Sequence, residues 1–447
     1  MKSDIIIIGA GPGGYETAHY AASKGLKVTI FEKGELGGTC LNRGCIPTKA
    51  LCKNVDIINQ LKEGPEFGID NITYSVDFAK MIERKNAVIA QLRDGVAMTL
   101  KHPNITLIKG EAEIKSSNEV ECNGEIHECD NMIIATGSKP KLLPVNGTNV
   151  PCILTSDEIL ELKTLPKTLC IIGGGVIGLE FASIFSSLGV DVTIVEFCKE
   201  IIPNFDSDIA KRLRQYLSKK GVTVNIGAGV TGIEEMPDGS ATIKYEQKGK
   251  SFEISCEKVL MAVGRTPVIP KGLENTCVEY SNRGITVDGN MQTNVKGVYA
   301  IGDVNSLCML AHAATFQGKR AINAILGEAD NIRLDIMPSA IFTSLEASMV
   351  GVTDSYCKEH NIDVTVKKAF FRANGKAVAM NETDGILKLI VSTNNNKILG
   401  CHILGPHAAD LIQEVTTLMN CEATIDCLKD IIHAHPTLGE VVLTAVQ

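Results

Sequence analysis

Two different patterns of apolar and polar residues follow one another at the start of the chain. Residues 5–8 form a short apolar run, typical of a buried strand, which leads directly into a glycine-rich turn at 9–14. Small and apolar residues then recur at helical spacing until Gly25, and a second apolar run ends at Glu32. The pattern therefore predicts a strand, a glycine turn, a helix and a second strand.

The same pattern returns in the middle of the chain, at residues 168–197. Shifting residues 7–32 by 164 positions places them on 171–196, and 13 of the 26 aligned residues are identical. Neither copy is low in complexity, so chance is a poor explanation. We interpret both copies as the opening βαβ unit of a dinucleotide-binding domain and expect an α/β fold with two Rossmann-like domains.

Each copy carries the G-x-G-x-x-G spacing of a dinucleotide-binding turn. The glycines permit a tight turn, and the following helix N-terminus offers N–H groups to a pyrophosphate. They are Gly9, Gly11 and Gly14 in the first copy and Gly173, Gly175 and Gly178 in the second. Glu32 and Glu196 each lie 23 residues beyond the first glycine (32 − 9 and 196 − 173), where a carboxylate can accept hydrogen bonds from ribose hydroxyls. Two such sites predict an enzyme that passes electrons between two cofactors.

Two similar phrases divide the rest of the chain. Residues 133–140 (IIATGSKP) and 259–267 (VLMAVGRTP) are each an apolar strand that ends at glycine, and we expect Gly137 and Gly264 to line the cofactor sites. The predicted segments are the first part of one dinucleotide-binding domain (1–147), a second dinucleotide-binding domain (148–267), a return to the first domain (268–333) and a separate α+β domain (334–447).

A pair of cysteines follows the first βαβ unit, in the phrase GGTCLNRGCIPTKAL at 37–51. Pro47 suits the first turn of a helix, and sulfurs at a helix N-terminus are stabilised as reactive thiolates. A bridge between Cys40 and Cys45 needs a distorted helix start, which Gly44 makes plausible. Two ordinary thiols or half of a metal site are the alternatives, but no second ligand pair at useful spacing supports a metal. We expect a redox-active pair and no metal site.

This phrase resembles the active-site sequence of the flavoprotein disulfide reductases, the class I pyridine nucleotide-disulfide oxidoreductases, and within them the dihydrolipoyl dehydrogenase branch. The resemblance covers essentially the whole chain. It implies that Cys45 is the sulfur beside the flavin and that Cys40 exchanges with substrate. It further implies that Lys49 lies beside the flavin ring, paired with Glu180, and that Asp303 in YAIGDV binds the ribityl chain of FAD.

Near the C-terminus, HAHPTLGE at 433–440 resembles the same family's H-x-H-P-T-x-x-E motif. Thiol–disulfide exchange needs a base, and histidine titrates in the right range. The resemblance makes His435 the acid/base and Glu440 its carboxylate partner, whereas His433 is expected to support the structure. In this family the histidine serves the cysteines of the opposite subunit, which implies a homodimer.

The resemblance also assigns the cofactors, with FAD in the first repeat and NAD in the second. Glu196 would repel a 2′-phosphate, and Lys199 is the only basic residue just beyond it, so NAD is expected rather than NADP. The implied reaction oxidises protein-bound dihydrolipoamide to lipoamide and reduces NAD⁺. The implied partner is a lipoyl-bearing protein of a 2-oxo acid dehydrogenase, acetoin or glycine cleavage system.

Two other functions remain open. One is an NADH-dependent reductase of another low-molecular-weight disulfide, and the other is a non-catalytic flavoprotein that acts as a redox sensor. A mercuric reductase is disfavoured because the chain ends in TAVQ and not in a vicinal cysteine pair. In the interface domain, TSLE at 343–346 departs from the family's usual Pro-Glu.

Composition narrows the partners and the compartment. The net charge is −8 and no block of Lys or Arg stands out, which disfavours nucleic acid and anionic lipid. No apolar run reaches the 18 or so residues that a membrane span needs, and we expect no signal peptide and no fused lipoyl domain. The 15 cysteines are mostly single, which predicts the reducing cytoplasm, with Cys170, Cys198 and Cys421 as small buried hydrophobes.

Overall fold

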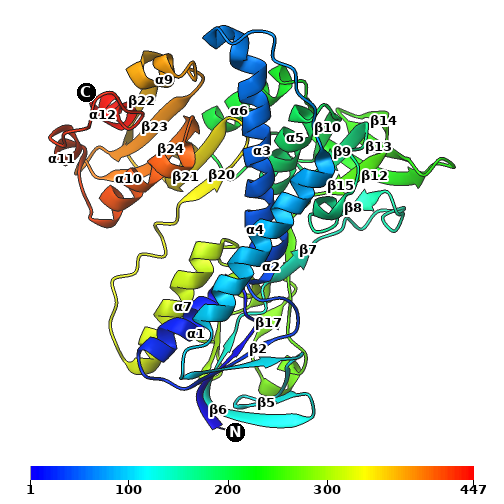
Figure 1. Cartoon of the computed structure of the whole chain (residues 1–447). Helices are drawn as coiled ribbons and strands as arrows, with labels where there is room; N and C mark the ends of the chain where they lie inside the picture. Colours follow the sequence, from blue (N-terminus) through cyan, green and yellow to red (C-terminus); the bar gives the residue numbers. More distant parts are fainter. Residues whose placement is uncertain (1) are drawn as a thin grey trace. The chain divides into compact units, whose positions relative to one another are not determined.

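The computed structural model describes residues 2–447 of the chain (Figure 1). These residues form two compact units, each assembled from segments that are distant in sequence. The first unit comprises residues 2–50, 79–141 and 264–334, and the second comprises residues 51–78, 142–263 and 335–447.

A seven-stranded sheet forms the centre of the first unit. Its order is β3-β2-β1-β6-β5-β4, with β19 also paired to β6. Neighbours among β1, β2, β3, β6 and β19 are parallel, whereas β4 and β5 are antiparallel. The strands are β1 (Lys2–Ile8), β2 (Val28–Glu32), β3 (Ile105–Lys109), β4 (Glu113–Ser116), β5 (Glu119–Cys122), β6 (Glu125–Ile134) and β19 (Val298–Ala300).

The helices of this unit are α1 (Pro12–Ser23), α2 (Gly38–Arg43), most of α4 (Phe78–Thr99) and α7 (Ala311–Leu326), with the start of α3 (Cys45–Glu63). Helix α1 packs against α7 at a point of close approach. A Cβ at Gly318 would lie 1.7 Å from Thr17 Oγ1, so only glycine fits there. Short elements complete the unit: β7 (Ser138–Pro140) pairs with β16 (Arg265–Pro267), β17 (Tyr280–Ser281) pairs with β18 (Gly284–Ile285), and 3-10 turns span η3 (Leu273–Thr276) and η4 (Gly302–Asn305).

The second unit contains a parallel sheet of order β11-β10-β9-β15-β8 and an antiparallel sheet of order β12-β13-β14. The elements are β8 (Ile153–Leu154), β9 (Thr168–Ile172), β10 (Asp191–Glu196), β11 (Thr223–Ile226), β12 (Ala228–Glu235), β13 (Ala241–Gln247), β14 (Lys250–Cys256) and β15 (Lys258–Met261), with helices α5 (Val176–Ser187) and α6 (Ser207–Lys219) and turns η1 (Gly64–Phe67) and η2 (Ile159–Glu161).

A further antiparallel sheet of the second unit has the order β20-β21-β24-β23-β22. Its elements are β20 (Ser339–Ile341), β21 (Glu346–Gly351), β22 (Val364–Phe370), β23 (Ile386–Ser392) and β24 (Ile398–Gly405), with η5 (Phe371–Ala373) and helices α8 (Asp354–Glu359), α9 (Gly375–Ala379), α10 (Ala408–Asn420), α11 (Ile425–Lys429) and α12 (Glu440–Val446). The predicted class, two Rossmann-like α/β domains and a C-terminal α+β domain, is confirmed.

The sequence repeat is also a repeat of structure. Helices α1 and α5 both have 12 residues, and a shift of 164 places Pro12 on Val176 and Ser23 on Ser187. The strands that precede and follow these helices occupy equivalent places, because β2-β1-β6 in one sheet matches β10-β9-β15 in the other. The same local sequence therefore builds the same strand–turn–helix–strand unit twice.

A buried ionic cluster in the second unit joins the N-terminus of α6 to strand β23. Lys388 Nζ lies 2.7 Å from Asp206 Oδ2, 3.0 Å from Asp354 Oδ2 and 3.3 Å from Asp208 Oδ2. The side chains of Lys388 and Asp206 are 1% and 0% exposed. Burial alone lowers the pKa of Lys388, but hydrogen bonds with Asp206 and Asp354 outweigh it and hold that pKa above its ordinary value.

Replacing Lys388 with methionine should destabilise the protein strongly. The substitution keeps an aliphatic chain but leaves the buried Asp206 carboxylate without its cation, which typically costs about 3–5 kcal/mol. Thermal melting measures the change, with Lys397→Met as the control, because the Lys397–Glu422 pair is on the surface, with side chains 40% and 59% exposed. Equal melting temperatures for the two variants would contradict the expectation.

Candidate active site

The first glycine turn has the shape of a phosphate cradle. Gly9 has a φ of +106°, and a Cβ there would lie 2.5 Å from the carbonyl oxygen of Ala135. A Cβ at Gly14 would lie 1.8 Å from the carbonyl oxygen of Gly9, so this glycine lets helix α1 pack onto the turn. Gly11, the N-cap of α1, has no side-chain cap, which leaves the first N–H groups of the helix available to an anion.

The second turn repeats this arrangement. Cβ atoms at Gly173 and Gly178 would lie 2.4 Å from the carbonyl oxygen of Ala262 and 2.1 Å from that of Gly173. Gly175 is the N-cap of α5, and a Cβ there would meet nothing within 4 Å. In both turns the outer glycines are required by close packing, whereas a Cβ on the middle glycine would meet no atom closer than 3.8 Å, so a pyrophosphate can approach the backbone there.

The two predicted ribose carboxylates are fixed by equivalent backbone hydrogen bonds. The N–H groups of Ala10 and Gly34 donate to Glu32 Oε2 and Oε1, each at 2.7 Å. The N–H groups of Gly174 and Cys198, 164 residues further on, donate to Glu196 Oε2 and Oε1, each at 2.5 Å. Each carboxylate oxygen keeps a further lone pair, so both side chains remain able to accept from a ribose hydroxyl.

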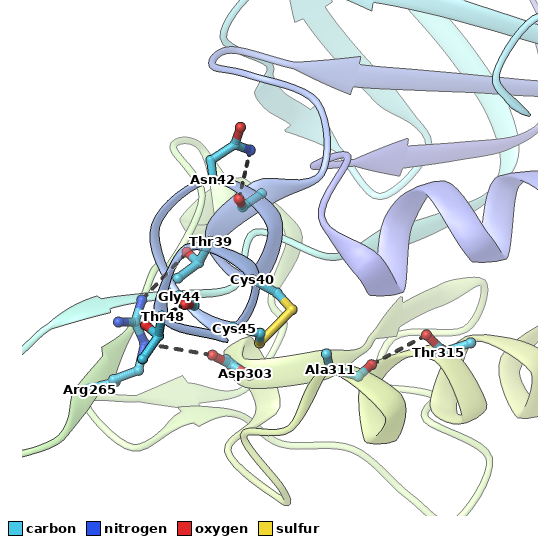
Figure 2. The surroundings of a disulfide bond; sticks show 11 residues. Thr39, Cys40, Asn42, Gly44, Cys45, Thr48, Arg265, Asp303, Ala311 and Thr315 are labelled. Carbon is cyan, nitrogen blue, oxygen red and sulfur yellow. Dashed lines mark hydrogen bonds and ion pairs between the residues drawn. A yellow bond between two sulfur atoms is a disulfide. The ribbon is translucent and has the colours of Figure 1, made fainter. Parts of the chain in front are cut away.

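The two cysteines of the redox phrase form a disulfide, with their Cα atoms 4.7 Å apart. They lie on two separate helices, not on one distorted helix start. Cys40 is in the short helix α2, Cys45 is the first residue of α3, and Gly44 between them leaves the helical region with ψ near −107°. Figure 2 shows the bridge at this break. The break places the second sulfur at the start of a 19-residue helix.

Contacts within the first unit hold the redox segment against the first glycine turn. Gly38 has a φ of +57°, and a Cβ there would lie 2.7 Å from the Cα atom of Gly11. Asn42 donates to the carbonyl oxygens of Leu36 and Gly38 at 2.9 and 2.8 Å. Arg93 of α4 donates twice to Asn42 Oδ1, at 3.1 and 2.8 Å. The disulfide is therefore held next to the predicted FAD cradle.

Asp303 lies at the start of η4, in the same unit. Its Oδ2 accepts a 2.5 Å hydrogen bond from Ser138 Oγ and lies 4.0 Å from Arg265 Nε. Gly137 and Gly264 flank the short strands β7 and β16 and have φ values of +70° and +104°. A Cβ on either glycine would meet no atom within 4 Å, so both border open space.

Lys49 and Glu180 lie on different helices. Lys49 is the fifth residue of α3 and is half-buried. Glu180 is buried in α5, where its Oε1 accepts a 3.0 Å hydrogen bond from the N–H of Phe342. An ion pair between them stays a prediction.

The C-terminal phrase places a histidine and a carboxylate in contact. His435 Nδ1 lies 2.9 Å from Glu440 Oε1, and the N–H of Thr437 donates to Glu440 Oε2 at 2.8 Å. The Thr437 N–H and the His435 ring hold the pKa of the Glu440 carboxyl below its usual value. The His435 side chain is 78% exposed, so its Nε2 is accessible to a thiol. His433 instead bonds Glu414 Oε1 through Nε2, at 2.8 Å, and its side chain is 8% exposed.

The remaining cysteines are thiols in the described chain, and their burial differs from the sequence expectation at two positions. Cys170 is buried as predicted, but Cys198 is only half-buried and Cys421 is exposed. The interpretation of Cys421 was wrong because this residue follows the last residue of α10, where the helix ends at the surface.

Within residues 2–447, no group of three or more His, Cys, Asp or Glu residues is placed to hold a metal ion. No helix among these residues is both long and apolar enough to span a membrane.

Four polar residues of the site were not predicted from the sequence: Asn42, Arg93, Ser138 and Arg265. All but Arg93 lie within the sequence phrases described above. The phrases LNRGC, TGSKP and VGRTP contain them, and a polar residue beside a strand-ending glycine was the available signal. No local sequence signal pointed to Arg93, because its partner Asn42 is 51 residues away.

Comparison with known proteins identifies the family. Residues 3–318 match the pyridine nucleotide-disulphide oxidoreductase family, and residues 337–446 match the dimerisation domain of the same family. The chain belongs to this family. It is an oxidoreductase, a flavoprotein with a disulfide-based redox centre.

Curated members of the family resemble the chain over its whole length. The dihydrolipoyl dehydrogenase of Chlamydia muridarum is 40% identical over 445 residues, which cover 98% of this chain and 95% of the relative. The dihydrolipoyl dehydrogenase of Geobacillus stearothermophilus is 40% identical over 453 residues, covering 100% and 96%. Among solved structures, the HOCl-induced flavoprotein disulfide reductase RclA of Escherichia coli has a TM-score of 0.88 at 29% identity, covering 99% of each chain.

The family's cofactors are FAD and NAD, and they are the cofactors of this oxidoreductase. The site residues fit them. Two helix N-termini without a side-chain cap, each with the middle glycine of its turn as the N-cap, suit two pyrophosphates. The disulfide lies in the same unit as the first of these cradles.

Proposed function

We propose that this flavoprotein oxidises protein-bound dihydrolipoamide to lipoamide and reduces NAD⁺ to NADH. The observation that carries the proposal is the pairing of a redox disulfide in the first unit with a histidine–carboxylate pair in the C-terminal domain. Relatives that are 40% identical over almost their entire length are dihydrolipoyl dehydrogenases, which supports the choice of substrate.

The chemistry begins with thiol–disulfide exchange. A thiolate of dihydrolipoamide attacks Cys40, a mixed disulfide forms, and Cys45 leaves as a thiolate. The second substrate thiol then closes the lipoamide ring and releases Cys40. The substrate thus loses two electrons and two protons. Bound FAD supplies the two-electron carrier between the thiols and NAD⁺, which accepts a hydride.

His435 is proposed to move the protons of this exchange at Nε2. Glu440 holds Nδ1, so it fixes the tautomer and stabilises the ring when it is charged. The lowered pKa of Glu440 keeps its carboxylate ionised throughout the neutral range. In a homodimer, which the dimerisation domain supports, His435 would serve the disulfide of the partner subunit.

The remaining site residues have proposed roles in holding the cofactors. Gly9, Gly11, Gly14, Glu32, Gly137 and Asp303 would bind FAD, and Lys49 and Glu180 would pair beside it. Gly173, Gly175, Gly178 and Glu196 would bind NAD, and Gly264 would line a cofactor site. A lipoyl-bearing protein of a 2-oxo acid dehydrogenase, acetoin or glycine cleavage system is the proposed partner. The many cysteine thiols support a reducing, cytoplasmic location.

One measurement separates this function from its main alternative. NADH formation from dihydrolipoamide and NAD⁺ should be rapid, whereas NADH-dependent reduction of glutathione disulfide should be slow. The likeness to RclA, a disulfide reductase, favours the alternative of another disulfide substrate. Turnover with glutathione disulfide and none with dihydrolipoamide would establish that alternative and overturn the proposal.

The proposal also predicts the effect of Glu196→Gln. An amide has one acceptor oxygen, so either Gly174 or Cys198 loses its partner for a backbone N–H. NAD binding should weaken about tenfold, because the single amide oxygen can no longer accept from both backbone N–H groups and from a ribose hydroxyl, and one lost hydrogen bond costs about 1–3 kcal/mol. Titration of NADH binding measures the effect, and FAD content should not change.

The matched control is Glu253→Gln, at an exposed position of the same unit. It should bind NADH as the unmodified protein does. Unchanged NADH affinity in Glu196→Gln would contradict the assignment of the second cradle.

A further inference from the structure

Arg265 makes several hydrogen bonds in the unit that carries the redox disulfide. It begins strand β16, and its side chain is 13% exposed. Its Nε donates to Ser138 Oγ at 2.7 Å, and its Nη2 donates to the carbonyl oxygen of Ser138 at 2.8 Å. Nη2 also reaches Thr39 Oγ1, at 3.5 Å, one residue before Cys40. Figure 2 shows Arg265 with its contacts to Thr39 and Asp303.

The donor and the acceptor of each hydrogen bond in this network can be assigned. A guanidinium only donates, so Ser138 Oγ must accept from Arg265 Nε. The single hydroxyl proton of Ser138 is then committed to Asp303 Oδ2, at 2.5 Å. Arg265 therefore fixes the rotamer of the hydroxyl, and through it the plane of the Asp303 carboxylate.

The other carboxylate oxygen is the one left for a ligand. Across residues 2–447, Asp303 Oδ2 takes the contacts from Ser138 and Arg265, and no protein donor bonds Oδ1. The side chain is still 23% exposed. A carboxylate with one oxygen anchored and the other open suits a hydroxyl donor such as the ribityl chain of FAD.

We propose that Arg265 is a positioning residue that acts through Ser138 and Asp303 to orient the open carboxylate oxygen towards FAD. An arginine side chain is always charged in proteins, so it can hold the network throughout the working pH range. The contact with Thr39 ties the same side chain to the helix that carries Cys40. The proposal rests on the assigned role of Asp303 in FAD binding and is independent of which dithiol is the substrate.

The test measures FAD affinity of the apoprotein by flavin fluorescence, with no dithiol present. Arg265→Ala should weaken FAD binding about tenfold to a hundredfold, as expected when a charged hydrogen-bond partner is lost. Arg265→Lys should recover part of the loss, because an ammonium restores the charge but not the two-nitrogen geometry. Arg283→Ala, at an exposed turn of the same unit, is the control and should bind FAD normally.

A double-mutant cycle distinguishes positioning from general support. If Arg265 acts through Asp303, Arg265→Ala combined with Asp303→Asn should weaken FAD binding no more than Asp303→Asn alone. Additive losses, or normal FAD affinity in Arg265→Ala, would overturn the proposal.

The proposal can still be tested if the Arg265→Ala variant does not fold. If circular dichroism shows that Arg265→Ala is unfolded, Ser138→Ala and Arg265→Lys decide the matter. Normal FAD affinity in both would overturn the proposal, and weakened affinity in folded protein would support it. A failure of the proposed dihydrolipoamide reaction would leave these affinities unchanged, so the two failures are distinguishable.

Discussion

The Cys45→Ser substitution should lower the rate of NADH formation from dihydrolipoamide by at least about 10³-fold, because the two cysteines act as one chemical unit and removing either one abolishes its function. Serine cannot form the bridge to Cys40, so the substrate dithiol has no disulfide to reduce. FAD content should remain normal, since Cys45 lies outside the glycine cradle of α1. The steady-state rate of NADH formation, at matched FAD content, measures the loss.

Cys52→Ser is the matched control for this prediction. Cys52 lies two helical turns further along α3 and its thiol donates to the carbonyl oxygen of Phe342 at 3.2 Å. This variant should retain most of the activity. Equal rates for the Cys45 and Cys52 variants would refute the assignment of the redox centre.

His435→Ala should lower kcat by about 10²–10⁴-fold, the usual contribution of a general base. The loss should be largest near and below neutral pH, where few substrate thiols ionise without help. At alkaline pH the dithiol ionises by itself, so the gap between variant and unmodified protein should narrow. The pH profile of NADH formation from dihydrolipoamide measures both effects.

His433→Ala is the natural comparison, because this histidine lies two residues away and bonds Glu414. We expect it to lower the melting temperature while leaving the pH profile unchanged in shape. If His433→Ala alters the pH profile and His435→Ala does not, the roles of the two histidines are reversed.

The repeated parts of the fold could be predicted because their information is local. A strand, a glycine turn, a helix and a terminal glutamate occupy about 30 consecutive residues, and the last glycine of each turn has a steric reason within that stretch. Close packing at Gly14 and Gly178 is an example, since both press on the first glycine of their own turn.

The parts that escaped prediction depend on contacts across long stretches of chain. Strand β22 and the β12-β13-β14 sheet were not identified, because their exposed edges and charged residues weaken the apolar pattern. Arg265 bonds Ser138 across 127 residues, and nothing near either residue shows that the two strands pair.

Some site residues were placed correctly in contact although their roles remain proposals. His435 and Glu440 bond one another, and Cys40 and Cys45 form the bridge that the phrase suggested. For the glutamates, the sequence suggested a ribose partner but not the backbone hydrogen bonds that hold Glu32 and Glu196 in place. The four segment boundaries and the Lys49–Glu180 ion pair stay predictions.

The most direct test of the account is an anaerobic titration of the oxidised, FAD-loaded protein with dihydrolipoamide, without NAD⁺. We predict that one equivalent changes the flavin spectrum and makes Cys40 and Cys45 reactive towards alkylation. The Cys45→Ser variant should show no change in its flavin spectrum. Electrons would then have entered through the disulfide. An unchanged spectrum and an intact Cys40–Cys45 bridge after excess dihydrolipoamide would contradict the account, and the enzyme would need a different disulfide as its substrate.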